Sequence, residues 1–337
     1  MLSSKKQLDT PSTLHIEGFG ISLGTSKGKI IVKKEGNKLF STPKTLCDRI
    51  IIASKGVNIS SDLIYLCANN GIGIDFIECA KERLSMPYAS LYGTKFAYAK
   101  SFLKQLEILN SPKKFEFAKA FVTGKVKNQT AYLKRLNKYR KTLTPFISQC
   151  EDLYIKMDKN AKNENELMGF EGMISVAYWS AIQEVVKEKT DFPGRITQKA
   201  SDPLNAALNY GYAILYGRIK YHAIRASLAL HISFLHSLNE NKPTLVFDLI
   251  EEFRVFVVDK TVISLINRGK KLNLNKQNRL DKESRRLIAK SVIERINSPV
   301  KTKNASVKID TAISKQAYKL SRAIKENGNY QPFIGEY

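Results

Sequence analysis

The chain has 337 residues, of which 43% are hydrophobic and 26% are charged, and this composition excludes a disordered or fibrous protein. Its formal net charge of +24 at pH 7 indicates a polyanionic partner, because a compact protein repels itself at such an imbalance. A generally basic proteome is the alternative explanation. The four cysteines are scattered without a CxxC pair, so we expect neither a disulfide framework nor a zinc knuckle.

The N-terminal segment at residues 1–12 is polar and lacks the apolar stretch of a signal peptide. No apolar run in the chain approaches the roughly 18 residues that a membrane-spanning helix needs. We therefore expect a soluble cytoplasmic protein that makes no contact with a membrane.

The first 90 residues have the pattern of a small β-rich domain, because short alternating or β-branched runs are separated by Gly, Lys and Asn. Strands are expected at 13–24, 27–43, 48–54 and 72–78, and a short helix at 60–71. The sequence Glu35-Gly36-Asn37 is typical of a hairpin turn. Residues 83–93 contain Pro and Gly and are interpreted as the exit from this domain.

From about residue 94 onward, apolar residues recur at intervals of three and four, which predicts helices. Helices are expected at 96–109, 115–126, 130–143, 166–186, 203–230 and about 247–266. A basic helical segment and a polar tail ending in NYQPFIGEY follow. The predicted fold class is thus α+β, with a small β-rich domain at residues 1–90 and a larger all-α-helical domain at residues 91–337.

Two basic blocks, at 125–143 and 267–290, carry Tyr, Leu and Ile between their Lys and Arg residues. Neither block has the large apolar face of a membrane anchor, so nucleic acid is the favoured polyanion. The residues that we expect to contact DNA phosphates are Lys125, Lys127, Lys134, Arg135, Arg195, Arg285 and Arg286.

Glu171 is an acidic residue among apolar neighbours, with Gly169 and Gly172 close by. Glycines weaken a helix, so their presence indicates that a backbone or a ligand approaches closely here. The alternative is a buried carboxylate paired with an Arg or Tyr. His236 follows an apolar run, and a lone histidine in such a place is more often structural.

Three acidic residues, Asp248, Glu251 and Glu252, share one face of the helix expected at 247–266. Their carboxylates would crowd together unless Arg254 or a metal ion neutralised them. Carboxylates with one imidazole suit the hard cations Mg²⁺ or Mn²⁺ better than a thiolate-preferring metal. A solvated acidic helix face is the alternative, although the apolar residues around it disfavour full exposure.

Asn205 and Asn209 lie four residues apart on a helix that Asp202 and Pro203 begin, as an N-cap and first-turn pair. Two asparagines on one face of an apolar helix predict a buried polar contact, either in a site or in a structural network. Taken together, a Glu, a His and further carboxylates inside a basic protein are typical of a metal-dependent nuclease or strand-transfer enzyme.

Four motifs resemble, in this order, those of the CRISPR-associated integrase family, which inserts new spacers into CRISPR arrays. They are GFEGMISVAYW (169–179), GRITQKASDPLNAALNYGYAILY (194–216), FLH (234–236) and LVFDLIEEFR (245–254). The resemblance extends to GKVKNQTAYLKR (124–135) and GVNISSDLIYLCANNGIGIDFI (56–77), so it covers nearly the whole chain. One departure is ASLALHISFLH, where Ser227, Ala229 and Ser233 stand in place of the Gly-containing turn that the family commonly carries before its histidine.

The resemblance implies a catalytic helical domain whose metal ligands are Glu171, His236 and Glu251. It places Asp248 at a further acidic position beside the metal, and it places Glu252 at a variable position outside the site. Asn205, Asn209 and Arg254 are expected to form a supporting polar network. A neutral His236 as ligand predicts that activity is lost below about pH 6.

The resemblance also implies a reaction and its partners. The 3′-hydroxyl of a short incoming DNA duplex attacks a phosphodiester of the CRISPR repeat, in a transesterification that Mg²⁺ or Mn²⁺ assists. The β-rich domain is expected to mediate dimerisation and DNA contact, and two homodimers are expected to join a small ferredoxin-like partner in a heterohexamer.

Two alternatives keep the same fold. A casposon-type transposon integrase usually has an additional DNA-binding domain, for which the roughly 50 residues after the second basic block leave little room. A non-catalytic DNA-binding scaffold is disfavoured because all the acidic and histidine positions are present. An unrelated basic RNA-binding protein would have to match several ordered motifs by chance.

Overall fold

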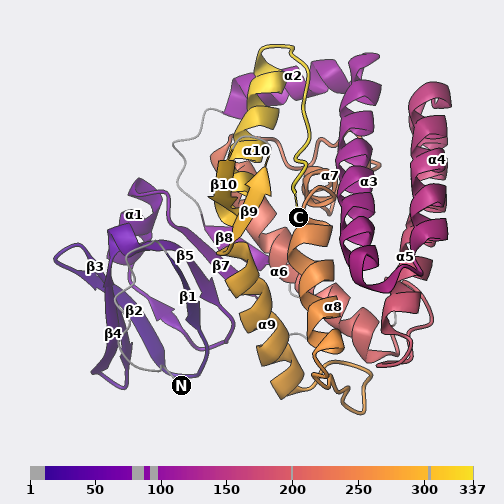
Figure 1. Ribbon diagram of the computed structural model, residues 1–337. Coiled ribbons are helices and arrows are strands. Elements are labelled where there is room, and N and C mark those ends of the chain that lie inside the picture. Colours follow the sequence, from indigo (N-terminus) through magenta and orange to yellow (C-terminus); the bar gives the residue numbers. More distant parts are fainter. Residues whose placement is uncertain (1–11, 78–86, 92–97, 199, 303–304, 337) are drawn as a thin grey trace. The chain divides into compact units, whose positions relative to one another are not determined.

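The structure is a computed structural model that describes residues 12–77, 87–91, 98–198, 200–302 and 305–336. The chain divides into two compact units, Met1–Phe96 (unit 1) and Ala97–Tyr337 (unit 2), as Figure 1 shows. Each unit has its own hydrophobic core. The sequence pattern placed the division between residues 90 and 91. Cys79 lies outside the described residues, and Cys47, Cys67 and Cys150 are free thiols. No helix in the described part of the chain is long and apolar enough to cross a membrane.

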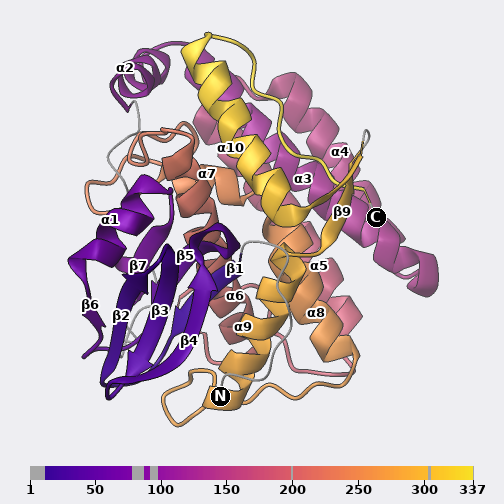
Figure 2. The ribbon, with the colours of Figure 1, turned by 90° about the vertical axis from the view of Figure 1, so that its left-hand side faces the viewer.

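The described residues of unit 1 form two four-stranded sheets and one α-helix, seen from the side in Figure 2. One sheet has the strand order β1-β5-β7-β8 and the other has the order β4-β3-β2-β6. The elements are β1 (Ser12–Ile16), β2 (Ile21–Ser26), β3 (Lys29–Lys34), β4 (Asn37–Pro43), the 3₁₀ turn η1 (Lys44–Leu46), β5 (Cys47–Ile52), β6 (Asn58–Ile59), α1 (Ser61–Asn69), β7 (Gly73–Ile77) and β8 (Pro87–Leu91).

Local sequence explains the turns of unit 1. The expected hairpin turn joins β3 and β4, with Glu35 at φ 49° and Gly36 at φ 81° in the left-handed region. Ser60 caps α1, because its hydroxyl accepts a hydrogen bond from the backbone N–H of Leu63 at 3.3 Å. The segment interpreted as the exit from the domain instead contributes a strand, β8, which pairs antiparallel with β7.

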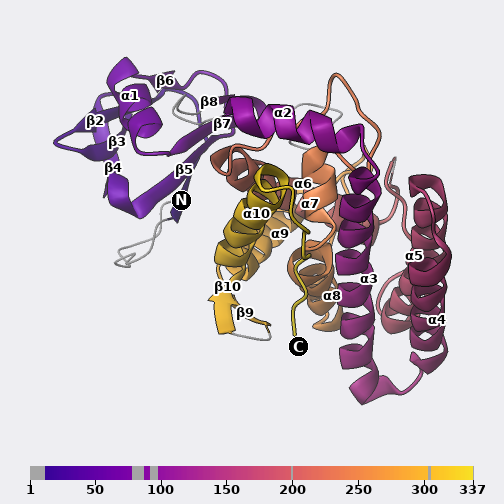
Figure 3. The same cartoon turned by 90° about the horizontal axis from the view of Figure 1, so that it is seen from above.

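Unit 2 is mostly helical, which confirms the α+β prediction, although it also contains a two-stranded hairpin that the sequence pattern did not indicate. Its elements are α2 (Tyr98–Leu109), α3 (Lys113–Arg140), α4 (Thr144–Asn160), α5 (Glu164–Val186), α6 (Pro203–Arg225), α7 (Leu245–Ile250), the π-helical turn η2 (Val255–Asp259), α8 (Lys260–Asn267), α9 (Lys282–Ile296), β9 (Pro299–Thr302), β10 (Ala305–Lys308) and α10 (Ile309–Lys325). Figures 1 and 3 show α3, α4 and α5 lying side by side.

The two helices expected at 115–126 and 130–143 are one continuous 28-residue helix, α3. Gly124 sits in its middle, where a Cβ atom would come within 2.8 Å of Pro332 Cβ. The glycine therefore marks a close approach of the C-terminal tail, and it does not end the helix.

The single helix expected at 247–266 is wrong. The chain forms α7, a turn at 251–253, the wider turn η2 and then α8. Nearly every residue from Glu251 to Asp259 is buried, so the polar side chains of this segment need partners within the protein. The added residue of a π turn changes the rotation between successive side chains, and such turns are frequent at functional sites.

The C-terminal tail packs into unit 2, although its sequence is polar. Tyr330 and Phe333 are each 6% exposed, and the Phe333 ring stacks on Phe253 with centroids 4.7 Å apart. The buried Asn128 of α3 donates hydrogen bonds to the backbone oxygens of Glu252 at 2.8 Å and Phe333 at 3.0 Å. The tail therefore joins α3 to the segment that follows α7.

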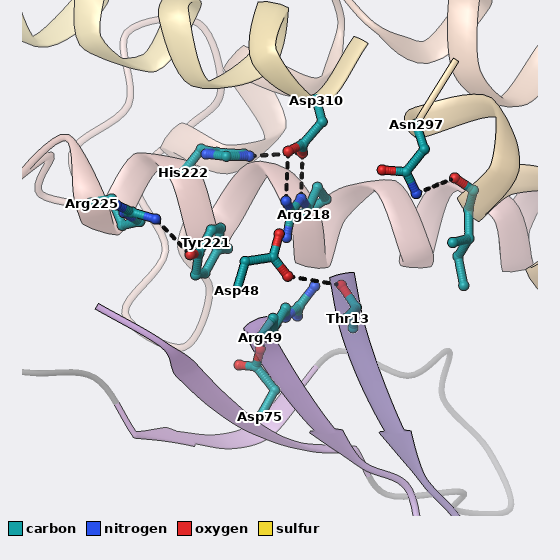
Figure 4. A network of polar contacts seen from close by, with 11 residues as sticks. Thr13, Asp48, Arg49, Asp75, Arg218, Tyr221, His222, Arg225, Asn297 and Asp310 are labelled. Atoms are coloured by element: carbon teal, nitrogen blue, oxygen red, sulfur yellow. Dashed lines mark hydrogen bonds and ion pairs between the residues drawn. The ribbon is translucent and has the colours of Figure 1, made fainter. Parts of the chain in front are cut away.

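A polar cluster fastens α10 to α6 (Figure 4). The carboxylate of Asp310 accepts hydrogen bonds from the guanidinium of Arg218, including one from Nη2 at 2.6 Å, and lies 2.9 Å from Nε2 of His222. Burial alone would raise the pKa of Asp310, but the bonds from Arg218 and His222 hold it well below its usual range. In unit 1, Figure 4 shows the buried pair of Arg49 and Asp75 on neighbouring strands β5 and β7.

Candidate active site

The loop that carries His236 is organised by one buried carboxylate. Asp248 is fully buried in the first turn of α7, and its Oδ2 accepts the backbone N–H groups of Phe234 at 2.7 Å and Leu235 at 3.1 Å. Its Oδ1 accepts the N–H of His236 at 3.1 Å. Three backbone donors on one carboxylate hold the loop at a fixed position relative to α7.

The same carboxylate orients the imidazole of His236, whose Nδ1 lies 2.7 Å from Asp248 Oδ1. An ionised carboxylate only accepts hydrogen bonds, so Nδ1 carries the proton and Nε2 is the nitrogen left to bind a ligand. Burial would lower the pKa of His236, but the hydrogen bond and charge of Asp248, together with the charge of Glu251, raise it above the ordinary value. Asp248 therefore acts directly on the protonation of His236.

The residues that replace the expected Gly-containing turn are compatible with this loop. Ser227 adopts the left-handed conformation, at φ 59°, in which a glycine is usually found. Ser233 Oγ lies 2.6 Å from the carbonyl oxygen of His236 and 2.8 Å from Thr244 Oγ1. These contacts close the turn with side-chain hydrogen bonds.

Glu171 and Glu251 converge on one ammonium group. Lys125 of α3 forms an ion pair with Glu171 of α5, and its Nζ lies 2.9 Å from Glu251 Oε2. Ser175, one turn beyond Glu171, donates a hydrogen bond to Glu171 Oε1 at 2.8 Å. The alternative of a buried carboxylate paired with an Arg or Tyr is therefore wrong, because Glu171 is half-buried and pairs with a lysine and a serine.

Arg254 completes the charge balance around Glu251. Its Nη2 lies 2.9 Å from Glu251 Oε1, and its guanidinium lies over the ring of Tyr212, 4.9 Å from the ring centroid. Burial would raise the pKa of Glu251, but the charges of Arg254 and Lys125 lower it to about 2. Glu171, Glu251, Lys125 and Arg254 together carry no net charge when all four are ionised.

The three acids of the motif at 245–254 have separate partners, and Arg254 neutralises Glu251, which is one of the two compensations that the sequence suggested. Asp248 contacts the histidine loop, Glu251 contacts Lys125 and Arg254, and Glu252 contacts the C-terminal tail. Tyr330 Oη and the N–H of Phe333 each donate to Glu252 at 2.5 Å. The turn after Ile250 separates the three carboxylates, and each has its own partner.

Asn205 and Asn209 form a shared polar contact, as their spacing predicts, and their partner is Arg195; Asn205 is buried and Asn209 is half-buried. Arg195 donates to Asn205 Oδ1 at 3.0 Å and to Asn209 Oδ1 at 2.6 Å. Arg195 also lies over the rings of Trp179 and Tyr212, at 5.3 to 5.8 Å from their centroids. Because Arg254 lies over Tyr212 as well, this network adjoins the carboxylate pair.

A cavity of about 500 Å³ opens beside Lys125. Its lining includes Ser175, Trp179, Arg195, Tyr212 and Arg254.

The cavity is also lined by Asp259, a residue that sequence reasoning missed. Asp259 is fully buried, and Tyr178 and Tyr212 donate hydrogen bonds to its two carboxylate oxygens. Burial raises its pKa above the ordinary value, despite these bonds and the charges of Arg254 and Arg195. The sequence does hold one sign of this residue: it ends the apolar run VFVVD, and a carboxylate buried with such a run needs hydrogen-bond partners.

The residues expected to contact DNA lie in different environments. Lys125 is inside the carboxylate pair, with 14% of its side chain exposed, and Arg195 is held in the polar network. The other expected contacts are exposed. Lys127 lies over the Tyr154 ring, and Lys134 pairs with Glu151. The exposed set consists of Lys127, Lys134, Arg135, Arg285 and Arg286.

The carboxylate pair fits a hard divalent cation. Two glutamate side chains reach one cationic group, and Glu251 Oε2, which is buried, accepts no hydrogen bond of good geometry in the described structure. No group of three or more His, Cys, Asp and Glu side chains is already arranged to hold a metal among the described residues. The two carboxylates are spaced around the Lys125 ammonium, and Mg²⁺ commonly takes one or two protein carboxylates with substrate oxygens completing its coordination.

Comparison with known proteins identifies the family. Residues 14–294 match the family described as CRISPR associated protein Cas1. The chain belongs to the Cas1 family. The match covers more than half of the chain and confirms the family that the four motifs resemble.

Two curated Cas1 relatives match over almost their whole length. The CRISPR-associated endonuclease Cas1 1 of Francisella tularensis subsp. novicida is 29% identical over 95% of this chain and 98% of its own. The protein of the same name from Archaeoglobus fulgidus is 30% identical over 96% and 99%. The chain is thus an enzyme of the CRISPR-adaptation endonuclease and integrase class.

Solved structures share the fold. A casposase bound to its integration product has a TM-score of 0.77 at 22% identity, covering 95% of this chain and 92% of that chain. A Cas1 protein from Thermotoga maritima has a TM-score of 0.74 at 21% identity, covering 93% and 96%. A Cas6-RT-Cas1–Cas2 complex has a TM-score of 0.76 at 20% identity, with 99% of this chain and 37% of that chain covered.

Proposed function

We propose that the chain is a divalent-metal-dependent integrase that joins the 3′-hydroxyl of a short DNA duplex to a phosphodiester of a CRISPR repeat. The observation that carries the proposal is the convergence of Glu171 and Glu251 on one cation position beside the cavity. Two carboxylates at one position suit Mg²⁺ or Mn²⁺, both of which prefer oxygen ligands.

Glu171 and Glu251 would hold the metal, and His236 would join them through Nε2. When bound, the metal supplies Lewis-acid activation of the attacking hydroxyl and stabilises negative charge on the phosphate. Asp248 keeps the proton on Nδ1 of His236, so the unprotonated Nε2 stays available as a metal ligand. Arg254 holds Glu251 ionised and oriented, which keeps its carboxylate directed to the cation position.

The arginines around the cavity would bind the DNA backbone. Arg195 and Arg254 are fixed by stacking and hydrogen bonds, so they can contact phosphate with little loss of side-chain freedom. The exposed lysines and arginines of α3 and α9 would add sequence-independent contacts, and the affinity for DNA is expected to fall steeply with salt.

We further propose that the protein acts as a homodimer that assembles with a small ferredoxin-like partner into a heterohexamer on double-stranded DNA. The matched structure of a Cas6-RT-Cas1–Cas2 complex and the family membership support this assembly. The β-rich unit 1 would mediate dimerisation and DNA contact.

The test is strand transfer of a short duplex into a plasmid with and without a CRISPR repeat, measured for Glu171→Gln, Glu251→Gln and His236→Asn. Loss of a residue that only supports a metal ligand typically costs about 10–100-fold. Each of these substitutions removes a proposed ligand, so it is expected to reduce strand transfer by more than that while DNA binding persists. Glu294→Gln is the matched control, because this glutamate on α9 is 66% exposed and lies 4.0 Å from Lys290. Full strand transfer by Glu171→Gln or Glu251→Gln in Mg²⁺ or Mn²⁺ would remove the basis of the proposal.

The plasmid comparison separates the alternatives that share this fold. Integration that requires the repeat supports the CRISPR integrase, whereas equal integration into the plasmid without a repeat favours a transposon-type enzyme. A wild-type protein that binds DNA but transfers no strand in any divalent metal would be a scaffold.

A further inference from the structure

Lys125 already occupies a cation position. Its ammonium pairs with Glu171 from α5 and with Glu251 from the turn after α7, and these two carboxylates are the proposed metal ligands. The sequence pattern placed Lys125 in a basic block that contacts DNA, whereas its side chain is only 14% exposed. The lysine therefore neutralises the site when no metal is bound.

The local charges decide which group has to move when a divalent cation enters. Glu171 and Glu251 balance Lys125 and Arg254, so a divalent cation added to this set would leave two unbalanced positive charges in a largely buried place. Arg254 lies over Tyr212 and is bonded to Glu251 three residues away, so it is fixed. Lys125 has a flexible four-carbon stem, and it lines the cavity.

We propose that Lys125 is an exchangeable internal cation. In the metal-free protein its ammonium holds the two carboxylates together, and divalent metal displaces it toward the cavity, where it contacts a phosphate of the DNA. The inference rests on the proposed function, because it takes Glu171 and Glu251 as the metal ligands. It adds that metal and DNA each strengthen the binding of the other.

The reciprocal effect follows from linkage. A lysine that pairs with carboxylates is unavailable to phosphate, and metal binding releases it, so metal raises the affinity for DNA. DNA in turn provides the ammonium with a new anionic partner, so DNA raises the affinity for metal by the same factor. The lysine thus limits metal loading in the absence of substrate.

The first measurement is Mn²⁺ affinity by isothermal titration calorimetry without DNA. Lys125→Met removes the competing charge and is expected to bind Mn²⁺ at least about tenfold more tightly than the wild type. Lys125→Gln removes the charge but retains an N–H donor for the carboxylates, so it provides the measurement if Lys125→Met does not fold. The matched control is Lys119→Met, on the same helix, whose ammonium pairs with Asp158 at 2.9 Å, and its Mn²⁺ affinity is expected to be unchanged.

The second measurement is the affinity for a short duplex with blocked 3′ ends, by fluorescence anisotropy with and without Mn²⁺. In the wild type and in Lys119→Met, Mn²⁺ is expected to tighten DNA binding several-fold. In both Lys125 variants this effect of Mn²⁺ is expected to be much smaller. The wild-type measurement needs no substitution, so an unchanged DNA affinity in Mn²⁺ overturns the exchange even if both variants unfold.

The outcomes separate this inference from the proposed function. If Lys125→Met and Lys125→Gln bind Mn²⁺ no more tightly than the wild type, or if Mn²⁺ leaves wild-type DNA affinity unchanged, the exchange is overturned while the metal site stands. If Glu171→Gln binds Mn²⁺ as tightly as the wild type, the metal lies elsewhere and the proposed function fails. Tighter Mn²⁺ binding by both Lys125 variants with loss of the coupling supports the exchange.

Discussion

Replacement of Asp248 by Asn tests whether this carboxylate sets both the loop and the tautomer of His236. Asn has one oxygen, so its NH₂ group has to face one of two pairs of partners. If NH₂ faces the Oδ2 side, the N–H groups of Phe234 and Leu235 both lose their acceptor. If it faces the Oδ1 side, only the backbone N–H of His236 loses its acceptor, because the imidazole can move its proton to Nε2 and accept at Nδ1.

The second orientation is favoured, since it leaves one buried donor unsatisfied instead of two. That donor costs about 1–3 kcal/mol, and the two remaining bonds lose their charge assistance at about 1 kcal/mol each. The expected loss in the free energy of unfolding is therefore about 3–5 kcal/mol. For a unit of this size it corresponds to a fall in Tm of about 6–20 °C.

The same orientation places the proton of His236 on Nε2, the nitrogen that the proposed site needs as a metal ligand. Asp248→Asn is thus expected to lose strand transfer even at temperatures where it is folded. Urea denaturation followed by circular dichroism measures the stability, and the imidazole ¹⁵N chemical shifts measure the tautomer. Asp158→Asn is the control, because its side chain is 53% exposed, and its stability is expected to change by no more than about 0.5 kcal/mol.

Two results would refute this reasoning. One is an Asp248→Asn protein that is destabilised by less than about 1 kcal/mol, which would mean that the loop donors find other acceptors. The other is an imidazole that keeps its proton on Nδ1 in the variant, which would mean that Asp248 does not set the tautomer.

The remaining predictions concern stability and DNA affinity. Burial raises the pKa of Glu252 to about 8 from an ordinary value of 4.5, so the folded protein keeps a proton that the unfolded chain releases, and stability is expected to fall as pH rises through this window. Glu252→Gln should flatten that dependence in urea melts at pH 5 to 8, and an unchanged slope would contradict it. Asp310→Asn removes the carboxylate bound by Arg218 and His222 and is expected to cost about 3 kcal/mol in urea unfolding, whereas a loss below about 1 kcal/mol would show that α10 is held otherwise. Gly172→Ala is expected to stabilise α5 by about 0.5–1 kcal/mol, because nothing in the described structure lies within 4 Å of its Cβ. Its DNA affinity, measured by anisotropy, should fall if DNA approaches this face of α5, and unchanged affinity would exclude that approach.

Local signals predicted the elements that depend on neighbouring residues in sequence. Asp202 caps α6 as expected, since its Oδ1 accepts the N–H of Asn205 at 2.8 Å. Ser60 caps α1 in the same way. The Asn205 and Asn209 contact was also predictable, because a helix brings residues four apart to one face. Their partner Arg195 could not be predicted, since it comes from the preceding loop.

Helical periodicity could not predict how the carboxylates at 248–252 are divided, although the family resemblance placed Glu252 apart from Asp248 and Glu251. The division depends on a turn after Ile250, on backbone donors of the histidine loop and on the C-terminal tail, all of which are tertiary features. Helical periodicity assumes one continuous rotation, so it placed all three acids on one face. Lys125 was assigned to a basic block for a similar reason, because charge density along the sequence does not show which lysine faces a carboxylate pair.

The tail shows how distant segments hold the site in place. Asn128 lies one turn of α3 beyond Lys125, and it bonds to the backbone of Glu252, the residue after Glu251. Its Oδ1 also accepts the N–H of Gly335 at 3.1 Å, and Glu252 accepts the N–H of Phe333. Both residues of the ion pair, Lys125 and Glu251, therefore have a near neighbour in sequence, Asn128 or Glu252, that is bonded to the same tail. Because a shift of α3 along its axis would break these bonds, the tail fixes the position of Lys125 relative to Glu251.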